Sequence, residues 1–288
     1  MPSHVSKVIS YGCELHLNFF DNIKAIFPPD GKGRLVSMYG ATEGGPIALF
    51  DGNDITPSMR QLYKDGHGIC LGKTDSSIIE VSIRVPDEAG QYSFVSVLNN
   101  STSQDIQRIA GLKGEVCISG PGASTKCTNA EDTAATKITG ASGKIYHRTG
   151  DYGYYDREGN LWDMGRIAHA VKTKGGMIYA LQVEAAINTL KLREVYATAF
   201  VGVPSTGGGD VKIPFVVLRL FPEYTEVSPE TLNLMRDLLR ASKLLGHVDV
   251  QFIIHEAGVK WPVDPRHKSK IGRVEISQWA AAFLARQK

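Results

Sequence analysis

The sequence predicts a mixed α/β and α+β fold in two domains, and three observations support this prediction. The chain has 288 residues, which is enough for two hydrophobic cores. Up to residue 166, short runs of β-forming residues are separated by glycine turns. Beyond residue 166, apolar strands alternate with amphipathic helices, a pattern typical of a compact module. We therefore expect a strand-rich domain at 1–166 and a small α+β domain at 167–288.

The first domain is expected to contain one helix followed mostly by strands. In residues 14–27, Leu15, Phe19 and Ile23 recur at helical spacing, and "PPDGKG" ends the helix. The β-forming runs that follow end in glycine, Gly-Pro or polar turns. Strands are expected at 34–40, 76–85 and 114–121, with hairpins over 144–167.

The second domain is expected to alternate strands with helices. Ser228, Pro229 and Glu230 together form a good helix start. The stretch "PSTGGGDVK" at 204–212 is expected to be a flexible loop inside this domain. The expected elements are a hairpin at 169–180, helices at 181–190, 228–245 and 274–287, and strands at 194–204, 213–221 and 248–256.

The composition argues against several classes of protein. The formal net charge of +2 gives no nucleic-acid or membrane footprint, so neither a nucleic-acid partner nor a membrane surface is expected. No apolar run is long enough to span a membrane, and the N-terminus lacks the pattern of a signal peptide. The four cysteines are widely spaced and form no Cys-x-x-Cys pair. This composition predicts a cytoplasmic protein without a disulfide framework.

The stretch "SMYGATEGGPIALF" at 37–50 places polar groups on a glycine-flanked loop after an apolar run. The Thr42 hydroxyl and backbone N–H groups could reach phosphate oxygens, and the Glu43 carboxylate could hold Mg²⁺ against them. Gly40 lets the backbone approach closely, and Tyr39 could offer its ring face to a purine. On these residues alone, a simple turn with an exposed acid is the favoured alternative.

Two further stretches could serve the same chemistry. In "YHRTGDYGYYDREGNLWDMGR" at 146–166, Asp151 could accept both hydroxyls of a ribose, and Arg166 could meet a phosphate or that carboxylate. In "PVDPRHKSKIGR" at 262–273, Lys270 could neutralise a reacting carboxylate or phosphate. The alternatives are that Asp151 caps a turn and that the basic segment is an ordinary surface loop.

Together and in this order, "YGATE", "YHRTGD", "GR" and "SKIGR" resemble the nucleotide motifs of the adenylate-forming superfamily. That superfamily includes acyl- and aryl-CoA synthetases, luciferases and peptide-synthetase adenylation domains, and the resemblance covers essentially the whole chain. Within it, three stretches resemble the olefin-pathway β-lactone synthetases. They are "GHGICLGKTDSSIIEVSI", "GRIAHAVKTKGGMIYALQVEAAINT" and "PVDPRHKSKI". The resemblance implies adenylation of a β-hydroxy acid whose hydroxyl then closes on the activated carbonyl, without CoA.

The resemblance also implies a role for each site residue. The nucleotide and metal roles are phosphate contact by Thr42, magnesium binding by Glu43, close backbone approach at Gly40, adenine packing by Tyr39, ribose binding by Asp151 and nucleotide support by Arg166. Lys270 would be the lysine of the adenylation step, in which Thr42 and Glu43 also take part. Ala168, followed by His169, departs from the family's Asp or Lys at the domain hinge, which puts the usual hinge chemistry in doubt.

One family element is missing from this sequence, namely the Ser/Thr/Gly-rich loop that wraps the pyrophosphate upstream of the Tyr-Gly-x-Thr-Glu motif. The expected fold is therefore the last subdomain of the large N-terminal domain plus the small C-terminal domain. The expected partners are ATP, Mg²⁺, a small-molecule carboxylic acid and a separate N-terminal half. Two alternatives remain: an acyl-CoA ligase, for which CoA would be a further, less favoured cofactor, and a non-catalytic remnant that acts as a binding module.

Overall fold

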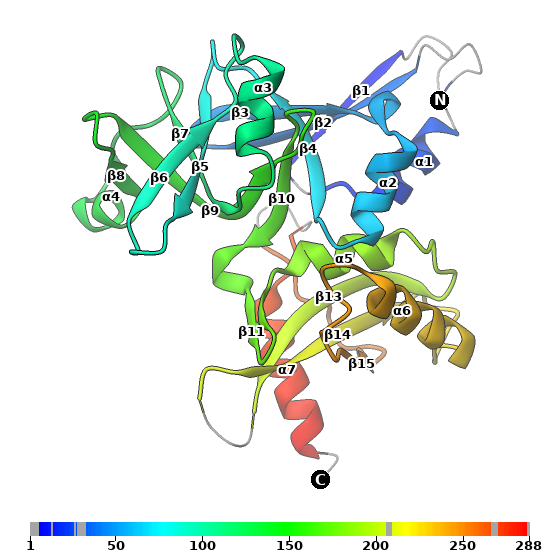
Figure 1. Cartoon of the computed structure of the whole chain (residues 1–288). Coiled ribbons are helices and arrows are strands. Elements are labelled where there is room, and N and C mark those ends of the chain that lie inside the picture. Colours follow the sequence, from blue (N-terminus) through cyan, green and yellow to red (C-terminus); the bar gives the residue numbers. More distant parts are fainter. Residues whose placement is uncertain are drawn as a thin grey trace. The chain divides into compact units, whose positions relative to one another are not determined.

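The computed structural model describes residues 6–12, 14–25, 27, 33–205, 209–265 and 270–286 (Figure 1). The described residues form two compact units, each of which combines separate stretches of the chain. The first unit draws on Met1–Gly12, Ile23–Asp54 and Cys70–Ile167, and the second on Cys13–Asn22, Ile55–Ile69 and Ala168–Lys288. No described helix is long and apolar enough to cross a membrane.

The expected mixed α/β architecture is confirmed. The strands of the described chain are β1 (Lys7–Tyr11), β2 (Arg34–Ala41), β3 (Gly45–Asp51), β4 (Ile69–Thr74), β5 (Glu80–Pro86), β6 (Tyr92–Ser96), β7 (Gly114–Ser119), β8 (Lys137–Thr139), β9 (Ile145–Tyr155), β10 (Leu161–Arg166), β11 (Val171–Thr173), β12 (Gly176–Ile178), β13 (Val195–Pro204), β14 (Lys212–Leu220) and β15 (Gln251–Ile254). The α-helices are α1 (Leu17–Lys24), α2 (Pro57–Lys64), α3 (Ser103–Ile109), α4 (Ala130–Thr136), α5 (Ala180–Asn188), α6 (Pro229–Ala241) and α7 (Arg273–Arg286). Two short 3₁₀ helices, η1 (Gly52–Asp54) and η2 (Ile167–His169), complete the set.

The expectation of one helix before residue 166 was wrong, because α2, α3 and α4 also lie there. Each begins with a side-chain cap, provided by Thr56, Thr102 and Asn129. The strand expected from residue 76 starts later, at Glu80, because Asp75 accepts the Ser77 amide and closes a turn. Of the loop expected at 204–212, residues 206–208 lie outside the described part, as do residues 266–269 of the basic stretch.

The first unit is built on a ten-stranded sheet, in the order β1-β2-β3-β4-β10-β9-β7-β5-β6, with β8 paired to β9. β1 and β2 are parallel, whereas β2–β3, β9–β10 and β7–β9 are antiparallel. Trp162 and Tyr155 are fully buried in its core. The Trp162 indole N–H donates to the Asp156 carboxylate at 2.8 Å, so its polar atom is satisfied inside the core.

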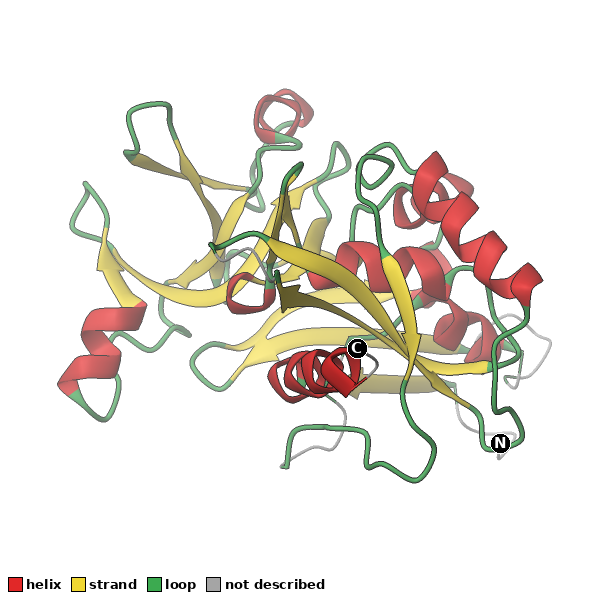
Figure 2. Ribbon diagram, turned by 90° about the horizontal axis from the view of Figure 1, so that it is seen from below, coloured by secondary structure: helices red, strands yellow, loops and turns green. Residues whose placement is uncertain are grey.

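The second unit is a three-stranded sheet, β13-β14-β15, with apolar cores on both faces. Side chains alternate along β13, so Phe200 faces one core while Ala199 and Val201 face the other. Residues of α5 and α6 fill the first core. Those of α7, the helix beside the C label in Figure 2, fill the second. This sandwich of helices and sheet explains why β13 and β14, at residues 195–204 and 212–220, are nearly continuous apolar runs.

A buried ion pair joins three elements of the second unit. The Arg273 guanidinium, at the first residue of α7, donates to both carboxylate oxygens of Glu184 on α5, at 3.2 and 2.6 Å. The side chains are only 10% and 2% exposed. Glu184 also accepts the backbone N–H of Phe200 on β13 at 2.7 Å. One carboxylate therefore fixes the start of α7 against both α5 and the sheet.

The segments at 14–22 and 55–69 belong to the second unit through polar contacts. Gln182 on α5 donates to the Gly66 carbonyl at 2.9 Å, and Ser242 after α6 donates to the Asp65 carbonyl at 2.8 Å. Both hydrogen bonds are buried. Ser242 also accepts the Leu245 N–H, which explains why α6 ends at Ala241 rather than at the expected residue 245.

Ion pairs of Asp21 on α1 also hold these segments within the second unit. It pairs with Arg60 on α2 at 2.6 Å and with Lys191 at 2.8 Å. The hydrogen bond from Arg60 is the largest of the effects that lower the pKa of Asp21 to about 2, and Lys191 adds to it. Its side chain is 20% exposed, so solvent screens the pairs only in part.

Asp21→Asn is expected to lower the free energy of unfolding by about 1–2 kcal/mol at pH 7, since two cations lose their shared carboxylate. Because the pKa of Asp21 is lower in the folded state, this stabilisation is complete above the unfolded pKa of 3.8 and is lost as the pH falls towards about 2. Urea unfolding of both proteins at pH 7 and pH 3 measures it. Asp237→Asn, which removes an exposed helical pair, is the control. An Asp21 effect that grew on acidification would contradict the prediction.

Glu184→Gln is expected to lower the free energy of unfolding by about 3 kcal/mol, because it leaves the Arg273 charge buried beside a neutral side chain. The matched control is Glu256→Gln, since Glu256 pairs with Arg286 at the exposed end of the same helix. That control should cost at most about 0.5 kcal/mol. Denaturant unfolding measures both, and equal losses would show that burial of the pair is unimportant.

Candidate nucleotide site

Three of the predicted nucleotide residues meet in the first unit. The Tyr39 hydroxyl on β2 donates to one Asp151 carboxylate oxygen at 2.5 Å. Arg166 Nε lies 3.5 Å from the other oxygen of Asp151. Asp151 on β9 and Arg166 on β10 are partners in the strand register. Tyr39 and Asp151 are 112 residues apart in sequence, so the fold alone makes this cluster.

The sheet must curl strongly to allow this contact. Counting along the sheet, β2 and β9 are separated by β3, β4 and β10. In a flat sheet, four spacings of about 4.8 Å would hold β2 and β9 roughly 19 Å apart. Irregularities in register after Tyr39 on β2 and between Asp163 and Gly165 on β10 locally increase bending. The curvature of the sheet therefore makes the cluster possible.

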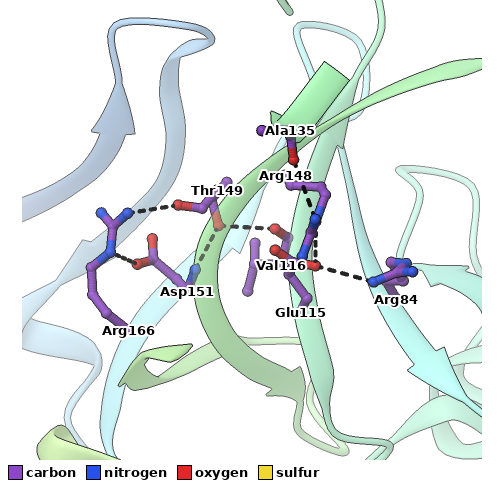
Figure 3. A network of polar contacts seen from close by, with 8 residues as sticks. All are labelled: Arg84, Glu115, Val116, Ala135, Arg148, Thr149, Asp151 and Arg166. Carbon is purple, nitrogen blue, oxygen red and sulfur yellow. Dashed lines mark hydrogen bonds and ion pairs between the residues drawn. The ribbon is translucent and has the colours of Figure 1, made fainter. Parts of the chain in front are cut away.

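Local chemistry holds Asp151 in place (Figure 3). The Asp151 N–H donates to Thr149 Oγ1 at 3.1 Å, and the Thr149 hydroxyl donates to the Val116 carbonyl on β7 at 2.9 Å. Gly150 adopts φ +78°, and a Cβ there would lie 3.1 Å from Arg166 Nη2. The Arg166 guanidinium also donates to the Thr149 carbonyl at 3.2 Å. The Thr-Gly-Asp sequence thus suits both the bend and the approach of the arginine.

The electrostatics of the cluster favour the neutral form of the Tyr39 phenol. Desolvation and the Asp151 carboxylate raise the pKa of Tyr39 well above its ordinary value. Asp151 is buried, whereas the Arg166 side chain is 50% exposed. A carboxylate offers two acceptor oxygens, and a guanidinium is a fixed cation with several N–H donors. The arrangement suits a ligand that carries hydroxyl groups next to an anionic group.

Thr42 and Glu43 lie in the turn that joins β2 to β3, a few residues after Tyr39. Thr42 is exposed and Glu43 is half-buried, and the Glu43 carbonyl accepts the Ser124 N–H at 2.7 Å. A Cβ at Gly40 would lie 2.6 Å from the Gly45 carbonyl oxygen, so a side chain there would force the hairpin apart. The turn agrees with the expected position of both side chains at the end of an apolar strand.

A second group of charges lies behind the cluster. Arg148 Nε donates to Glu115 at 2.8 Å, and Arg84 approaches the same oxygen at 3.4 Å (Figure 3). The Arg148 guanidinium also donates to the Ala135 carbonyl at 3.2 Å. Arg148 is therefore engaged in holding β9 against β7, and it is Arg166 that faces Asp151.

Lys270 belongs to the second unit and is exposed. Its N–H donates to the Asp264 carboxylate at 3.1 Å, and its carbonyl accepts the Asp264 N–H at 2.9 Å. Next to it, Val263 and Ile271 form an isolated β-bridge. The backbone of Lys270 is thus tied to Asp264, and Lys270 lies three residues before Arg273, whose buried ion pair anchors α7.

Several residues around these sites carry no sequence motif of their own. Thr149, Glu184 and Ser124 were not predicted from the sequence, because their roles depend on partners from distant elements. In the part of the chain that the structure describes, no three His, Cys, Asp or Glu side chains gather around one point where a metal ion could be held. Glu43 is the predicted magnesium ligand, and its half-buried position at the turn leaves that prediction open.

Comparison with known proteins gives the sequence relatives of the chain. Olefin β-lactone synthetase of Stenotrophomonas maltophilia is 31% identical over 289 residues, which cover 98% of this chain and 48% of that protein. Its counterpart in Xanthomonas campestris is 31% identical over 288 residues. A 4-chlorobenzoate–CoA ligase of Arthrobacter is 32% identical over 204 residues, or 69% of this chain. No protein-family model matches. The chain spans about half the length of the two synthetases.

Solved structures share the fold. Amide bond synthetase McbA from Marinactinospora thermotolerans matches with a TM-score of 0.66 and 21% identity over 95% of this chain and 47% of that one. Anthranilate CoA ligase AuaEII, in complex with anthranoyl-AMP, matches with a TM-score of 0.67, 18% identity and coverages of 97% and 45%. With the sequence relatives, these matches confirm the predicted family. The chain belongs to the adenylate-forming superfamily, and it corresponds to the C-terminal half of the superfamily's enzymes.

Proposed function

We propose that this chain supplies the nucleotide-binding part of an enzyme that activates a carboxylic acid as its acyl-adenylate, with ATP converted to AMP and pyrophosphate. The observation that carries the proposal is the contact of Tyr39 and Arg166 with the two oxygens of Asp151. In adenosine the base and the ribose are directly bonded, so the groups that bind them must be neighbours. The predicted adenine and ribose residues are such neighbours here.

ATP and Mg²⁺ fit the residues that are present. The Asp151 N–H is held by Thr149, and its carboxylate has two acceptor oxygens, which match the two hydroxyls of a ribose, while the half-exposed Arg166 would support the anionic part of the nucleotide. Thr42 would contact a phosphate, and Glu43 would hold Mg²⁺ against it. The metal neutralises phosphate charge when it is bound. The Mg²⁺ complex of Bacillus subtilis MenE with ATP, a structural relative, supports the same pairing of ligands.

Lys270 is proposed to act in the adenylation step. An ammonium group near the α-phosphate would offset the charge that develops as the acid's carboxylate attacks and pyrophosphate leaves. Its exposure leaves the ammonium group accessible, and the Asp264 contacts hold the backbone beneath it. The lysine stem is flexible, so the anchored backbone of Lys270 is what limits the reach of its ammonium group.

The acid is proposed to be a β-hydroxy fatty acid that leaves as a β-lactone. The support is the identity to two olefin β-lactone synthetases along nearly the whole chain. In such a reaction the β-hydroxyl oxygen bonds to the activated carbonyl carbon, and AMP leaves. The second candidate is an acyl-CoA ligase, in which a thiol attacks the same carbonyl. It is favoured by the 32% identity to a 4-chlorobenzoate–CoA ligase.

The proposed partner is the other half of the enzyme, which would carry the phosphate-wrapping loop and most of the acid pocket. Strand β1 pairs with β2 in parallel, yet Ile9 and Tyr11 on it are 53% and 71% exposed. Parallel strands are usually covered on both faces. The edge at β1 is therefore the proposed contact with that half. The alternative of a non-catalytic binding module would need no such contact.

Residues 1–288 alone are expected to show no acid-dependent ATP–pyrophosphate exchange, since the predicted phosphate loop is absent from this sequence. AMP should still bind, and Asp151→Asn should weaken it about tenfold through loss of a charge-assisted acceptor. Radiolabelled exchange and an NMR titration with AMP measure the two effects. Exchange by residues 1–288 alone would refute the proposal that a separate half completes the site. An AMP affinity that is unchanged in Asp151→Asn would refute the proposed nucleotide site.

In an enzyme completed by the missing half, Lys270→Ala is expected to reduce exchange by at least about a hundredfold, because a preorganised charge is lost from the transition state. AMP affinity should change little. Lys260→Ala, an exposed lysine earlier in the same region, is the control. Unchanged exchange in the Lys270 variant would rule out its proposed role.

A further inference from the structure

A relay of hydrogen bonds connects the Glu43 turn to the β8–β9 hairpin within the first unit. The Ser124 N–H donates to the Glu43 carbonyl at 2.7 Å. The Lys137 ammonium donates to the Ser124 carbonyl at 2.6 Å and lies 2.9 Å from His147 Nδ1. Ser124 therefore uses both of its backbone polar groups: its N–H donates to the Glu43 turn, and its carbonyl accepts a hydrogen bond from Lys137.

The contact between Lys137 and His147 fixes the protonation state of the histidine. An ammonium group has donors and no acceptor, so His147 Nδ1 must accept the bond and the ring must be neutral. His147 is only 6% exposed on β9. Burial and the Lys137 charge lower the pKa of His147, in agreement with this assignment. Glu43 and Glu115 are carboxylates whose charges act on His147 in the opposite sense.

The Lys137 ammonium is a charged group that contacts only uncharged acceptors among the described residues. Lys137 is half-buried on β8, and its two described acceptors are an uncharged carbonyl and a neutral imidazole. Withdrawing a cation from water without a carboxylate partner in contact costs free energy. The Glu43 side chain is half-buried nearby, and its charge contributes to the field at His147. A cation in this place is understandable if it holds an acidic turn in one geometry.

We propose that Lys137 is a positioning residue that, with His147, clamps Ser124 against Glu43 and so fixes the Thr42–Glu43 turn for the Mg²⁺-bound phosphates of ATP. This inference rests on the proposed function. Lys137 does not touch the nucleotide in this role. It acts through Ser124, whose N–H holds the backbone of the residue that would bind the metal. AMP, which lacks the β- and γ-phosphates, should depend on the relay much less than ATP does.

The first test needs no nucleotide. Lys137→Met keeps the length of the side chain and removes its donors, so hydrogen exchange at the Ser124 amide should accelerate by about tenfold or more. Lys144→Met is the matched control, because Lys144 lies in the same hairpin and pairs instead with Glu80. It should leave the Ser124 amide protected. An unchanged rate of hydrogen exchange at the Ser124 amide in Lys137→Met overturns the proposal, and this result does not depend on which ligand the protein binds.

The second test separates positioning from general stability. In residues 1–288, Lys137→Met should weaken ATP binding in the presence of Mg²⁺ by about tenfold and leave AMP binding within about twofold. Lys137→Arg should restore most of the ATP affinity. Equal losses for ATP and AMP would indicate a merely structural role and overturn the proposal. Failure of the unmodified chain to bind either nucleotide would refute the proposed function, while the exchange measurement would still decide the relay.

A second variant guards against misfolding. His147→Leu removes one acceptor of Lys137 and places an apolar side chain at this buried position. It should show the same pattern with a smaller amplitude, because the bond from Lys137 to Ser124 remains. Full retention of both Ser124 protection and ATP affinity in a folded His147→Leu protein would remove the histidine from the relay.

Discussion

A carboxylate and a guanidinium meet in the interior of the second unit, and three elements depend on their pairing. Glu184 receives two bonds from Arg273 and one from the Phe200 amide, so α5, α7 and β13 share one buried anion. Such a pair contributes little net stability compared with apolar packing, yet its loss leaves a buried charge. Its value here is geometric, because it fixes where α7 starts, three residues after Lys270.

In the first unit, the Asp151 carboxylate likewise brings side chains from separate strands together. That carboxylate is approached by a phenol and a guanidinium from two other strands, and it is oriented by its own neighbour Thr149. The two units thus each centre on one acid whose partners come from distant segments. One acid is sealed from solvent and serves the fold, whereas the other faces a half-exposed arginine.

Much of the architecture was predictable because its signals are local. Helical spacing predicted α1, the Ser-Pro-Glu start predicted α6, and the apolar runs of β13 and β14 indicated strands. The missed helices α3 and α4 bury none of their side chains, so they lack an apolar stripe. Their caps, at Thr102 and Asn129, were the signal that could have revealed them.

The sequence by itself determined the family, and it predicted the glycine-flanked turn that carries Thr42 and Glu43. The tertiary structure decided which of these residues meet. Tyr39 reaches Asp151 because the sheet curls across four strand spacings, and Ser124, which lies between β7 and α4, links Glu43 to Lys137 by hydrogen bonds. Spacing along the chain specifies neighbours within a helix or strand, whereas curvature and long-range pairing arise from the packing of the whole unit.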